Sequence, residues 1–164
     1  MAIGQIRKAL SGFYYVKSGD ALYQTRARGN FRKRRLAPLV GDRVEFSSTS
    51  PTDGYILAIQ KRHNQLKRPP VANVDQAVVV TSAVKPDFNS NLLDRFLVIL
   101  EAKEIQPLIY LTKTDLLDEA ALAKLTTTLA YYQKIGYSVL KATDPYQADN
   151  IAALSRHFKD RLTG

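Results

Sequence analysis

The strongest indication of the fold is a short apolar run that ends in a polar turn. Residues 107–111 (Pro-Leu-Ile-Tyr-Leu) are five apolar or aromatic residues in succession, with no alternation of polar and apolar positions. Such a run is typical of a strand that is covered on both faces, as in a parallel sheet. Because ligands bind at the carboxyl ends of parallel strands, the turn Thr112-Lys113-Thr114-Asp115 is predicted to form part of a binding site.

The side chains of this turn match the hydrogen-bonding edge of guanine. The Asp115 carboxylate has two acceptor oxygens, and guanine offers two adjacent donors, its ring N1–H and its exocyclic amino group, a pair that adenine lacks. Lys113 can lay its aliphatic stem along a base, and the Thr112 hydroxyl can tie the turn to a neighbouring loop. The alternative is a chance pattern in which Asp115 only caps the next helix.

The composition argues against several kinds of site. The 164-residue chain has no cysteine, so disulfides and thiolate metal sites are excluded, and its two histidines, His63 and His157, have no ligand-like spacing. No apolar run is long enough to span a bilayer, and residues 1–5 do not resemble a secretion signal. We therefore expect a cytoplasmic protein that makes no membrane contact and holds no metal within these residues.

Positive charge is concentrated in the first half of the chain. Residues 1–70 contain fourteen Lys or Arg against four Asp or Glu, a balance of +10, whereas residues 71–164 contain ten against eleven, a balance of −1. Together they give the formal net charge of +9. Two halves this different indicate two modules, of which the first faces a polyanion.

The first module, residues 1–68, shows short strand-like runs that are separated by turn signals, and no long helical period. The runs begin near Ile3, Phe13, Ala21, Arg43 and Tyr55. About five short strands predict a small all-β barrel. The OB-fold is the first candidate, since it commonly binds oligonucleotides through one face and its loops, and an SH3-like barrel is the alternative.

The densest charge run lies in this module, at residues 26–35, with six cations and one aromatic ring. It predicts a loop in which the cations neutralise RNA phosphates and the ring stacks on an unpaired base. The predicted RNA-binding residues are Arg26, Arg28, Phe31, Arg32, Lys33, Arg34 and Arg35. A merely solvated loop is the alternative. Tyr14, Tyr15 and Tyr23 can extend a stacking surface, but we expect them in the barrel core, where such aromatics are more often found.

Two consecutive prolines, Pro69 and Pro70, stiffen the chain where the pattern changes, and they place the boundary between the modules at 1–68 and 69–164. Beyond it, strand and helix patterns alternate. The predicted strands are residues 77–81, 108–111 and 137–140. The predicted helices have apolar periods at Leu92, Phe96 and Ile99 or Leu100, at Leu122, Leu125, Leu129 and Tyr132, and at Ile151, Leu154, Phe158 and Leu162. This order predicts a partial α/β domain with a parallel sheet that is wound right-handed.

Helix end signals support this second module. Asp118 is expected to cap the second helix and Gly136 to end it. The binding rim of the sheet should combine residues 82–86, 112–115 and 141–144, which follow the three strands. No Gly-x-x-x-x-Gly-Lys-Ser/Thr sequence occurs in the chain, although nucleotide hydrolysis of this type needs such a loop for the phosphates. The residues therefore predict base recognition without phosphate chemistry.

Five segments of the chain resemble the signatures of one family. They are residues 9–16 (Ala-Leu-Ser-Gly-Phe-Tyr-Tyr-Val), 26–29 (Arg-Ala-Arg-Gly), 38–44 (Pro-Leu-Val-Gly-Asp-Arg-Val), 68–76 (Arg-Pro-Pro-Val-Ala-Asn-Val-Asp-Gln) and 91–98 (Asn-Leu-Leu-Asp-Arg-Phe-Leu-Val). On these segments the chain is similar to RsgA, the circularly permuted GTPase family that depends on the small ribosomal subunit. The resemblance implies an OB domain followed by a GTPase domain of the P-loop type, in which the guanine-binding elements precede the phosphate loop, magnesium ligands and catalytic residues.

The resemblance assigns guanine recognition to four residues. Thr112, Lys113 and Asp115 match the family's Asn/Thr-Lys-x-Asp motif, and Ala142 occupies the loop that offers a backbone N–H to the guanine oxygen, with Lys141 where Ser is usual. It also implies that the chain is the N-terminal portion of a longer protein, in which GTP or GDP binds with Mg²⁺ and a C-terminal module holds a structural Zn²⁺. No catalytic residue is expected among these 164 residues.

The function implied by the resemblance is GTP hydrolysis during maturation of the small (30S) ribosomal subunit, by a monomer whose OB domain binds ribosomal RNA. The 164-residue chain alone is expected to be inactive. A protein of another class also fits the residues: a non-catalytic RNA- or ribosome-binding protein whose α/β module is only a scaffold.

Overall fold

A computed structural model describes residues 1–29, 31, 36–142, 148–159 and 161–164. The chain divides into two compact units, Met1–Val74 and Asp75–Gly164. The boundary expected after residue 68 falls within the first unit, in a short hairpin described below. Among the described residues, none of the helices has the length and apolarity required to span a membrane.

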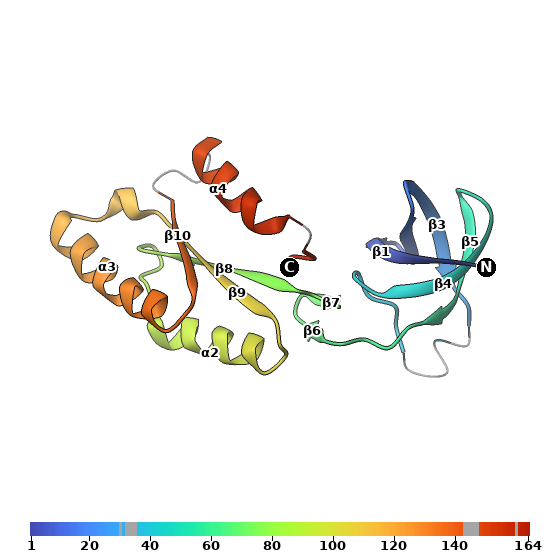
Figure 1. The fold of residues 1–164 in the computed structure, drawn as a ribbon, viewed down its shortest axis with the longest axis horizontal. Coiled ribbons are helices and arrows are strands. Elements are labelled where there is room, and N and C mark those ends of the chain that lie inside the picture. The colour runs from blue at the N-terminus through green and yellow to red at the C-terminus, as the bar shows by residue number, and fades with distance from the viewer. Residues whose placement is uncertain (30, 32–35, 143–147, 160) are drawn as a thin grey trace. The chain divides into compact units, whose positions relative to one another are not determined.

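The first unit is a closed barrel with the strand order β1-β2-β3-β5-β4 (Figure 1). Its strands are β1 (Ala2–Leu10), β2 (Phe13–Ser18), β3 (Ala21–Ala27), β4 (Arg43–Ser50) and β5 (Asp53–Ile59). β1 closes the barrel because it pairs antiparallel with both β2 and β4, and β3 runs parallel to β5. The OB-type expectation is confirmed, and closure leaves no free edge in the barrel.

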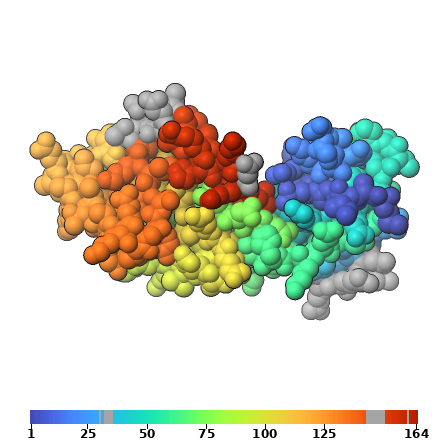
Figure 2. Space-filling model, viewed as in Figure 1, coloured from blue at the N-terminus to red at the C-terminus, as the bar shows by residue number. Residues whose placement is uncertain are grey.

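Side chains that alternate along the strands fill this barrel. Its buried centre consists of Ile6, Val16, Val44, Phe46 and Ile56. Tyr14 and Tyr23 pack against this cluster, as expected of core aromatics. Tyr15 points outward, where the Lys8 ammonium lies 5.3 Å from its ring centroid, so the expected core position is wrong for Tyr15. Figure 2 shows the side chains of β1, in dark blue, on the surface of this unit.

A hairpin that the sequence did not predict follows the barrel. β6 (Gln65–Lys67) pairs antiparallel with β7 (Pro70–Ala72), and the two prolines of the predicted boundary belong to it. Each strand has only three residues, so neither is long enough to show an alternating pattern.

A buried ion pair joins the barrel to this hairpin. Asp42 is 0% exposed, and its carboxylate accepts hydrogen bonds from Nε and Nη2 of Arg62, both at 2.7 Å. Arg62 also donates to the Ala37 carbonyl and to Gln65 of β6. Because the donors and acceptors of the pair are satisfied, it holds residues 37–42 against the hairpin without leaving an unpaired charge inside.

The second unit has a parallel sheet in the order β10-β9-β8. Its strands β8 (Gln76–Ser82), β9 (Gln106–Thr112) and β10 (Ser138–Lys141) alternate with helices α2 (Ser90–Glu101), α3 (Glu119–Lys134) and α4 (Ala148–Phe158). β8 and β10 both run parallel to β9, so the predicted α/β arrangement is confirmed. α2 and α3 lie on one face of the sheet and α4 on the other (Figure 1).

The stripe that α2 buries differs from the predicted one. The buried stripe consists of Leu93, Leu97 and Leu100. Of the predicted apolar positions, Leu92, Phe96 and Ile99 are 53%, 47% and 48% exposed, whereas Leu100, the alternative to Ile99, is buried. Both stripes have the same i, i+4, i+7 spacing, so periodicity alone did not distinguish between two neighbouring stripes. α2 is therefore apolar on a buried stripe and on an exposed one.

The ends of α3 agree with the sequence, whereas the end of α4 does not. The Asp118 carboxylate caps α3, Gly136 follows its last turn with a φ of +106°, and the buried side chains are Leu125, Leu129 and Tyr132. α4 ends at Phe158, so the prediction that Leu162 belongs to it is wrong. Leu162 precedes Thr163, which forms an isolated bridge with Gln76 of β8, and the Leu162 carbonyl accepts hydrogen bonds from the backbone N–H groups of Asp75 and Gln76.

Candidate functional site

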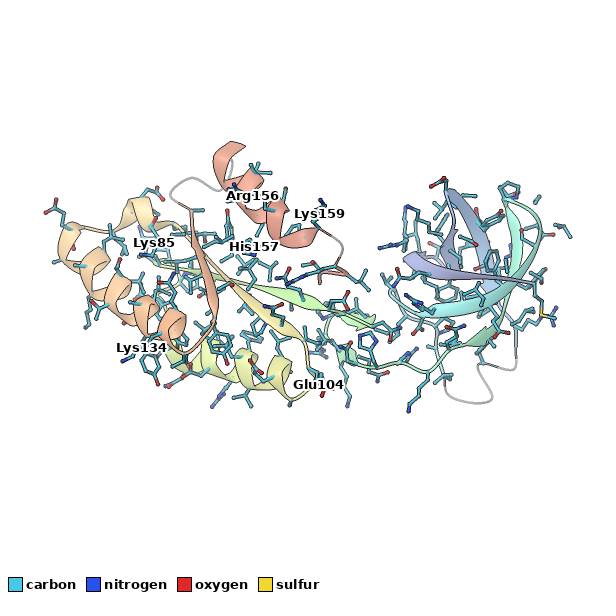
Figure 3. The ribbon with its side chains drawn as sticks, in the orientation of Figure 1. Lys85, Glu104, Lys134, Arg156, His157 and Lys159 are labelled. Atoms are coloured by element: carbon cyan, nitrogen blue, oxygen red, sulfur yellow. The ribbon has the colours of Figure 1, made fainter. Side chains whose placement is uncertain are left out.

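The carboxyl ends of the three parallel strands meet at one rim of the second unit. The register places Ser82 of β8 beside Thr112 of β9, and Lys141 of β10 beside Leu111. Two of the predicted rim segments, 82–86 and 112–115, therefore lie side by side, and Lys141 flanks them. Residues 143 and 144 of the third segment lie outside the described residues. Figure 3 marks this rim by Lys85 and the opposite end of the sheet by Glu104.

The turn at 112–115 leaves the strand through a left-handed residue. Lys113 has φ +61° and ψ +31° and precedes the short 3₁₀ helix η1 (Thr114–Leu116). A left-handed backbone costs a residue with a Cβ about 1–2 kcal/mol, so the surrounding contacts must hold it there. Such residues cluster at ligand-binding and catalytic sites, where the local geometry matters more than the local strain.

Three side-chain hydrogen bonds fix this turn to both neighbouring strand ends. They run from Thr112 Oγ1 to the Thr81 carbonyl at 3.3 Å, from Lys113 Nζ to the Lys85 carbonyl, and from Thr114 Oγ1 to the Ala142 carbonyl at 3.3 Å. The Thr112 hydroxyl was expected to tie the turn to a neighbouring loop, and its partner is instead a residue of the neighbouring strand β8. The sequence analysis gave no role to Thr114, which is buried, since no local pattern indicates which strand end its hydroxyl reaches.

Asp115 is exposed on this rim. η1 has no side-chain cap, and α3 is capped by Asp118, which accepts from the Ala121 N–H at 2.7 Å. The alternative in which Asp115 only caps the next helix therefore loses its basis. An exposed carboxylate on a turn that is held from both sides is suited to accept two hydrogen bonds from one planar ligand edge.

Ala142 lies at the rim with both of its backbone groups engaged. Its N–H donates to the Leu111 carbonyl at 2.8 Å, and its carbonyl accepts from Thr114. The next N–H groups of this loop belong to residues 143–147, which lie outside the described residues. Ala142 is thus a structural neighbour of the turn, and its direct contact with guanine stays a prediction.

The described part of the predicted RNA-binding run lies on the barrel. Residues 32–35, which are Arg32, Lys33, Arg34 and Arg35, lie outside the described residues. The Arg26 guanidinium lies 4.7 Å from the Phe13 ring centroid, and that of Arg28 lies 6.0 Å from the ring centroid of Tyr55. Phe31 packs against the barrel core and lines a cavity of about 590 Å³ together with Arg28.

The sequence analysis missed Phe13 and Tyr55 as outward aromatics. The signal was present for Phe13, because Tyr14 and Val16 point inward and successive strand residues alternate. For Tyr55, the inward neighbours Gly54 and Ile56, both buried, give the same indication.

Comparison with known proteins assigns both units. The family model described as RsgA N-terminal domain matches residues 3–56, and the model described as RsgA GTPase matches residues 59–164. Two proteins named small ribosomal subunit biogenesis GTPase RsgA are similar throughout. The one from Enterococcus faecalis is 57% identical over 98% of this chain and 53% of its own length, and the one from Latilactobacillus sakei is 53% identical over 99% and 55%.

Two solved structures share the fold. YloQ, described as a circularly permuted GTPase, is 45% identical with a TM-score of 0.81, and YjeQ from Thermotoga maritima is 29% identical with a TM-score of 0.83. Each covers 99% of this chain, and the chain covers 58% of each. The chain spans about half the length of the curated relatives it matches. The N-terminal and GTPase family models match one after the other along the chain, and the GTPase model covers more than half of the chain's residues. The chain therefore belongs to the RsgA family.

Proposed function

We propose that this chain recognises guanine nucleotide and ribosomal RNA as part of a GTPase of small ribosomal subunit biogenesis. The observation that carries the proposal is the turn at 112–115, which presents an exposed Asp115 at the sheet rim and is tied to both neighbouring strand ends. The relatives' name, small ribosomal subunit biogenesis GTPase, supports the same role.

Each residue of the turn has a task in base selection. Asp115 accepts hydrogen bonds from the N1–H and the amino group of guanine, and bonds to a charged acceptor contribute about 1.5–3 kcal/mol. Lys113 covers one face of the base with its stem while its ammonium is held by the Lys85 carbonyl. Thr112 and Thr114 keep the turn in place. Adenine is rejected because it would leave the carboxylate oxygens facing a ring acceptor.

Phosphate chemistry is assigned to residues that this chain does not contain. It has no Gly-x-x-x-x-Gly-Lys-Ser/Thr sequence, and within the described ranges no three His, Asp or Glu side chains gather as metal ligands. In this proposal, GTP hydrolysis, Mg²⁺ binding and a zinc module belong to a longer form of the protein, as the resemblance to the family implies. The 164-residue chain alone is expected to show no GTP turnover.

The barrel unit is proposed to bind ribosomal RNA. It has fourteen Lys or Arg against four Asp or Glu up to residue 70, which favours a polyanionic partner. In this proposal the protein works as a cytoplasmic monomer on the small ribosomal subunit.

Asp115→Asn tests the guanine site in a longer form that carries the phosphate loop. An amide cannot accept from both guanine donors, so GDP affinity should fall by about 1.5–3 kcal/mol, while xanthosine diphosphate should bind better because its C2 oxygen accepts from the amide. Isothermal titration calorimetry measures the affinities for GDP and xanthosine diphosphate in the wild type and the variant.

Asp118→Asn is the matched control for this test, because it removes a nearby carboxylate by the same substitution and leaves a side chain that also caps helices well. Its affinity for both nucleotides should equal that of the wild type. An unchanged GDP affinity in Asp115→Asn would instead favour a scaffold role for the second unit.

A further inference from the structure

The outward face of the barrel carries aromatic and cationic side chains in one row. Phe13 of β2 lies opposite Arg26 of β3, and Arg26 lies opposite Tyr55 of β5. Residues that are directly opposite in a sheet share a face, with their Cβ atoms about 5 Å apart. We call Phe13, Arg26 and Tyr55 the outer row. The backbones of Phe13 and Tyr55 are two strand spacings apart, about 10 Å, and Arg26 lies between them.

Cations accompany the rings of this face. Arg26 lies 4.7 Å from the Phe13 ring centroid and Arg28 lies 6.0 Å from that of Tyr55. Tyr15, two residues from Phe13 on the same strand face, has Lys8 at 5.3 Å. All three distances lie within the range of cation–π attraction, about 6 Å.

These rings are not part of the barrel core. The core cluster and the aromatics that pack against it include Tyr14, Tyr23 and Phe31, but not Phe13, Tyr15 or Tyr55. Tyr55 is 41% exposed. The rings therefore contribute apolar, planar surface to the outside of a strongly basic unit.

A cavity borders the outer row. Its volume is about 590 Å³, and its lining includes Gly12, Tyr14, Arg28, Phe31 and Pro38. Arg28 belongs to both places, because it lines the cavity and also lies beside the Tyr55 ring. The volume falls in the range of about 300–1,000 Å³ that is usual for ligand pockets.

We propose that this face is a stacking surface for unpaired RNA bases. Phe13, Tyr15 and Tyr55 stack on the bases, Lys8, Arg26 and Arg28 bind the phosphates between them, and the cavity lined by Arg28 takes a further base. The inference rests on the proposed RNA-binding function and narrows it to single-stranded RNA. Bases in a duplex have both faces covered by their neighbours, so they cannot stack on protein rings.

The test compares two labelled RNAs of equal length, one single-stranded and one a blunt duplex, by fluorescence anisotropy with the 164-residue chain. Stacking on an aromatic ring changes affinity by about fivefold or more per base. The double variant Phe13→Leu/Tyr55→Leu should therefore bind the single strand at least about tenfold more weakly and the duplex as the wild type does. Both side chains point outward, and circular dichroism verifies that the variant folds.

Two further variants separate the contributions of rings and charges. Tyr131→Leu removes a tyrosine that is 61% exposed on α3 and should bind both RNAs as the wild type does. Arg26→Gln/Arg28→Gln should weaken the binding of both RNAs. For the single strand, the slope of log affinity against log salt should become shallower by about 0.7 for each phosphate contact that is lost.

The outcomes distinguish this inference from the proposed function. A loss confined to the single strand in the ring variant supports the stacking surface. If the ring variant loses as much affinity for the duplex as for the single strand, or loses none for either, the stacking surface is overturned. In that case, salt-dependent RNA binding by the wild type would still support the proposal that the barrel binds RNA. If the wild type binds neither RNA, the RNA-binding part of the proposed function fails together with the inference.

Discussion

Without the Arg62 guanidinium, the buried Asp42 carboxylate would keep only a backbone N–H as its partner. Removing one partner of a buried ion pair costs about 3–5 kcal/mol, because the remaining charge is uncompensated. We expect Arg62→Ala to lower the free energy of unfolding of the first unit by about this amount, measured by urea denaturation followed by circular dichroism.

Arg43→Ala is the control for this substitution, since Arg43 is an exposed cation on β4 and its loss should change the free energy of unfolding by less than about 0.5 kcal/mol. A loss of less than about 1 kcal/mol in Arg62→Ala would mean that water satisfies Asp42 once the guanidinium is gone.

The sequence located the candidate site but not the contacts that hold it. The end of a buried strand placed Thr112, Lys113 and Asp115 at the rim, because strand burial can be read from a local run of residues. The bond from Thr114 to the Ala142 carbonyl and the occupied Ala142 N–H depend on the register between β9 and β10. A register between strands that are far apart in the chain is set by packing of the whole sheet, so no local pattern revealed it.

At the level of elements, a hydrogen bond joins α2 and α3. The Tyr132 hydroxyl donates to Asp94 Oδ1 at 2.7 Å. Burial, and then the bond to Asp94, raise the pKa of Tyr132 above its ordinary value near 10. The folded state therefore keeps this proton at a pH where the unfolded state releases it. The stability that results is fully present below about pH 10 and is lost as the pH rises further.

Tyr132→Phe should test this link. At pH 7 the variant should be less stable by about 1.5–3 kcal/mol, because it lacks the hydroxyl that donates a hydrogen bond to the charged Asp94 carboxylate. Above pH 10 the difference should shrink, since the wild type alone loses stability through this group. Urea denaturation at both pH values measures it, with the exposed neighbour Tyr131→Phe as the control. A difference that does not change with pH would contradict the account.

Local patterns predicted which strands and helices exist and in what order. They did not always predict which face of a helix is buried or where a helix ends. Five alternating strands and the strand–helix alternation of the second half are strong signals over many residues. Which of two adjacent stripes of α2 is buried depends on where the sheet lies beside the helix. Leu162 kept the helical spacing of α4 but pairs with β8 instead, because an open strand edge offers it backbone partners.

For the whole molecule, the boundary between the two units predicts where the chain can be divided. β7 (Pro70–Ala72) pairs with β6, and the Asn73 side chain donates to the Gly41 carbonyl at 3.1 Å, so both belong to the first unit. A chain of residues 1–74 should therefore unfold cooperatively with a higher melting temperature than one of residues 1–68. Circular dichroism during heating compares them, and equal melting temperatures would favour the boundary at the prolines.

The pairing of Leu162 with the start of β8 has a consequence for the outer side of this strand. The Asp75 N–H donates to the Leu162 carbonyl at 2.9 Å, and the Leu162 N–H donates to Asp75 Oδ2 at 2.8 Å. The chain thus enters the second unit and reaches residue 162 at neighbouring points. Gly164 continues this pairing, because its N–H donates to the Gln76 carbonyl and its carbonyl accepts from the Val78 N–H, both at 3.0 Å. Residues 162–164 therefore cover backbone groups of β8 that would otherwise be open to pairing with another chain.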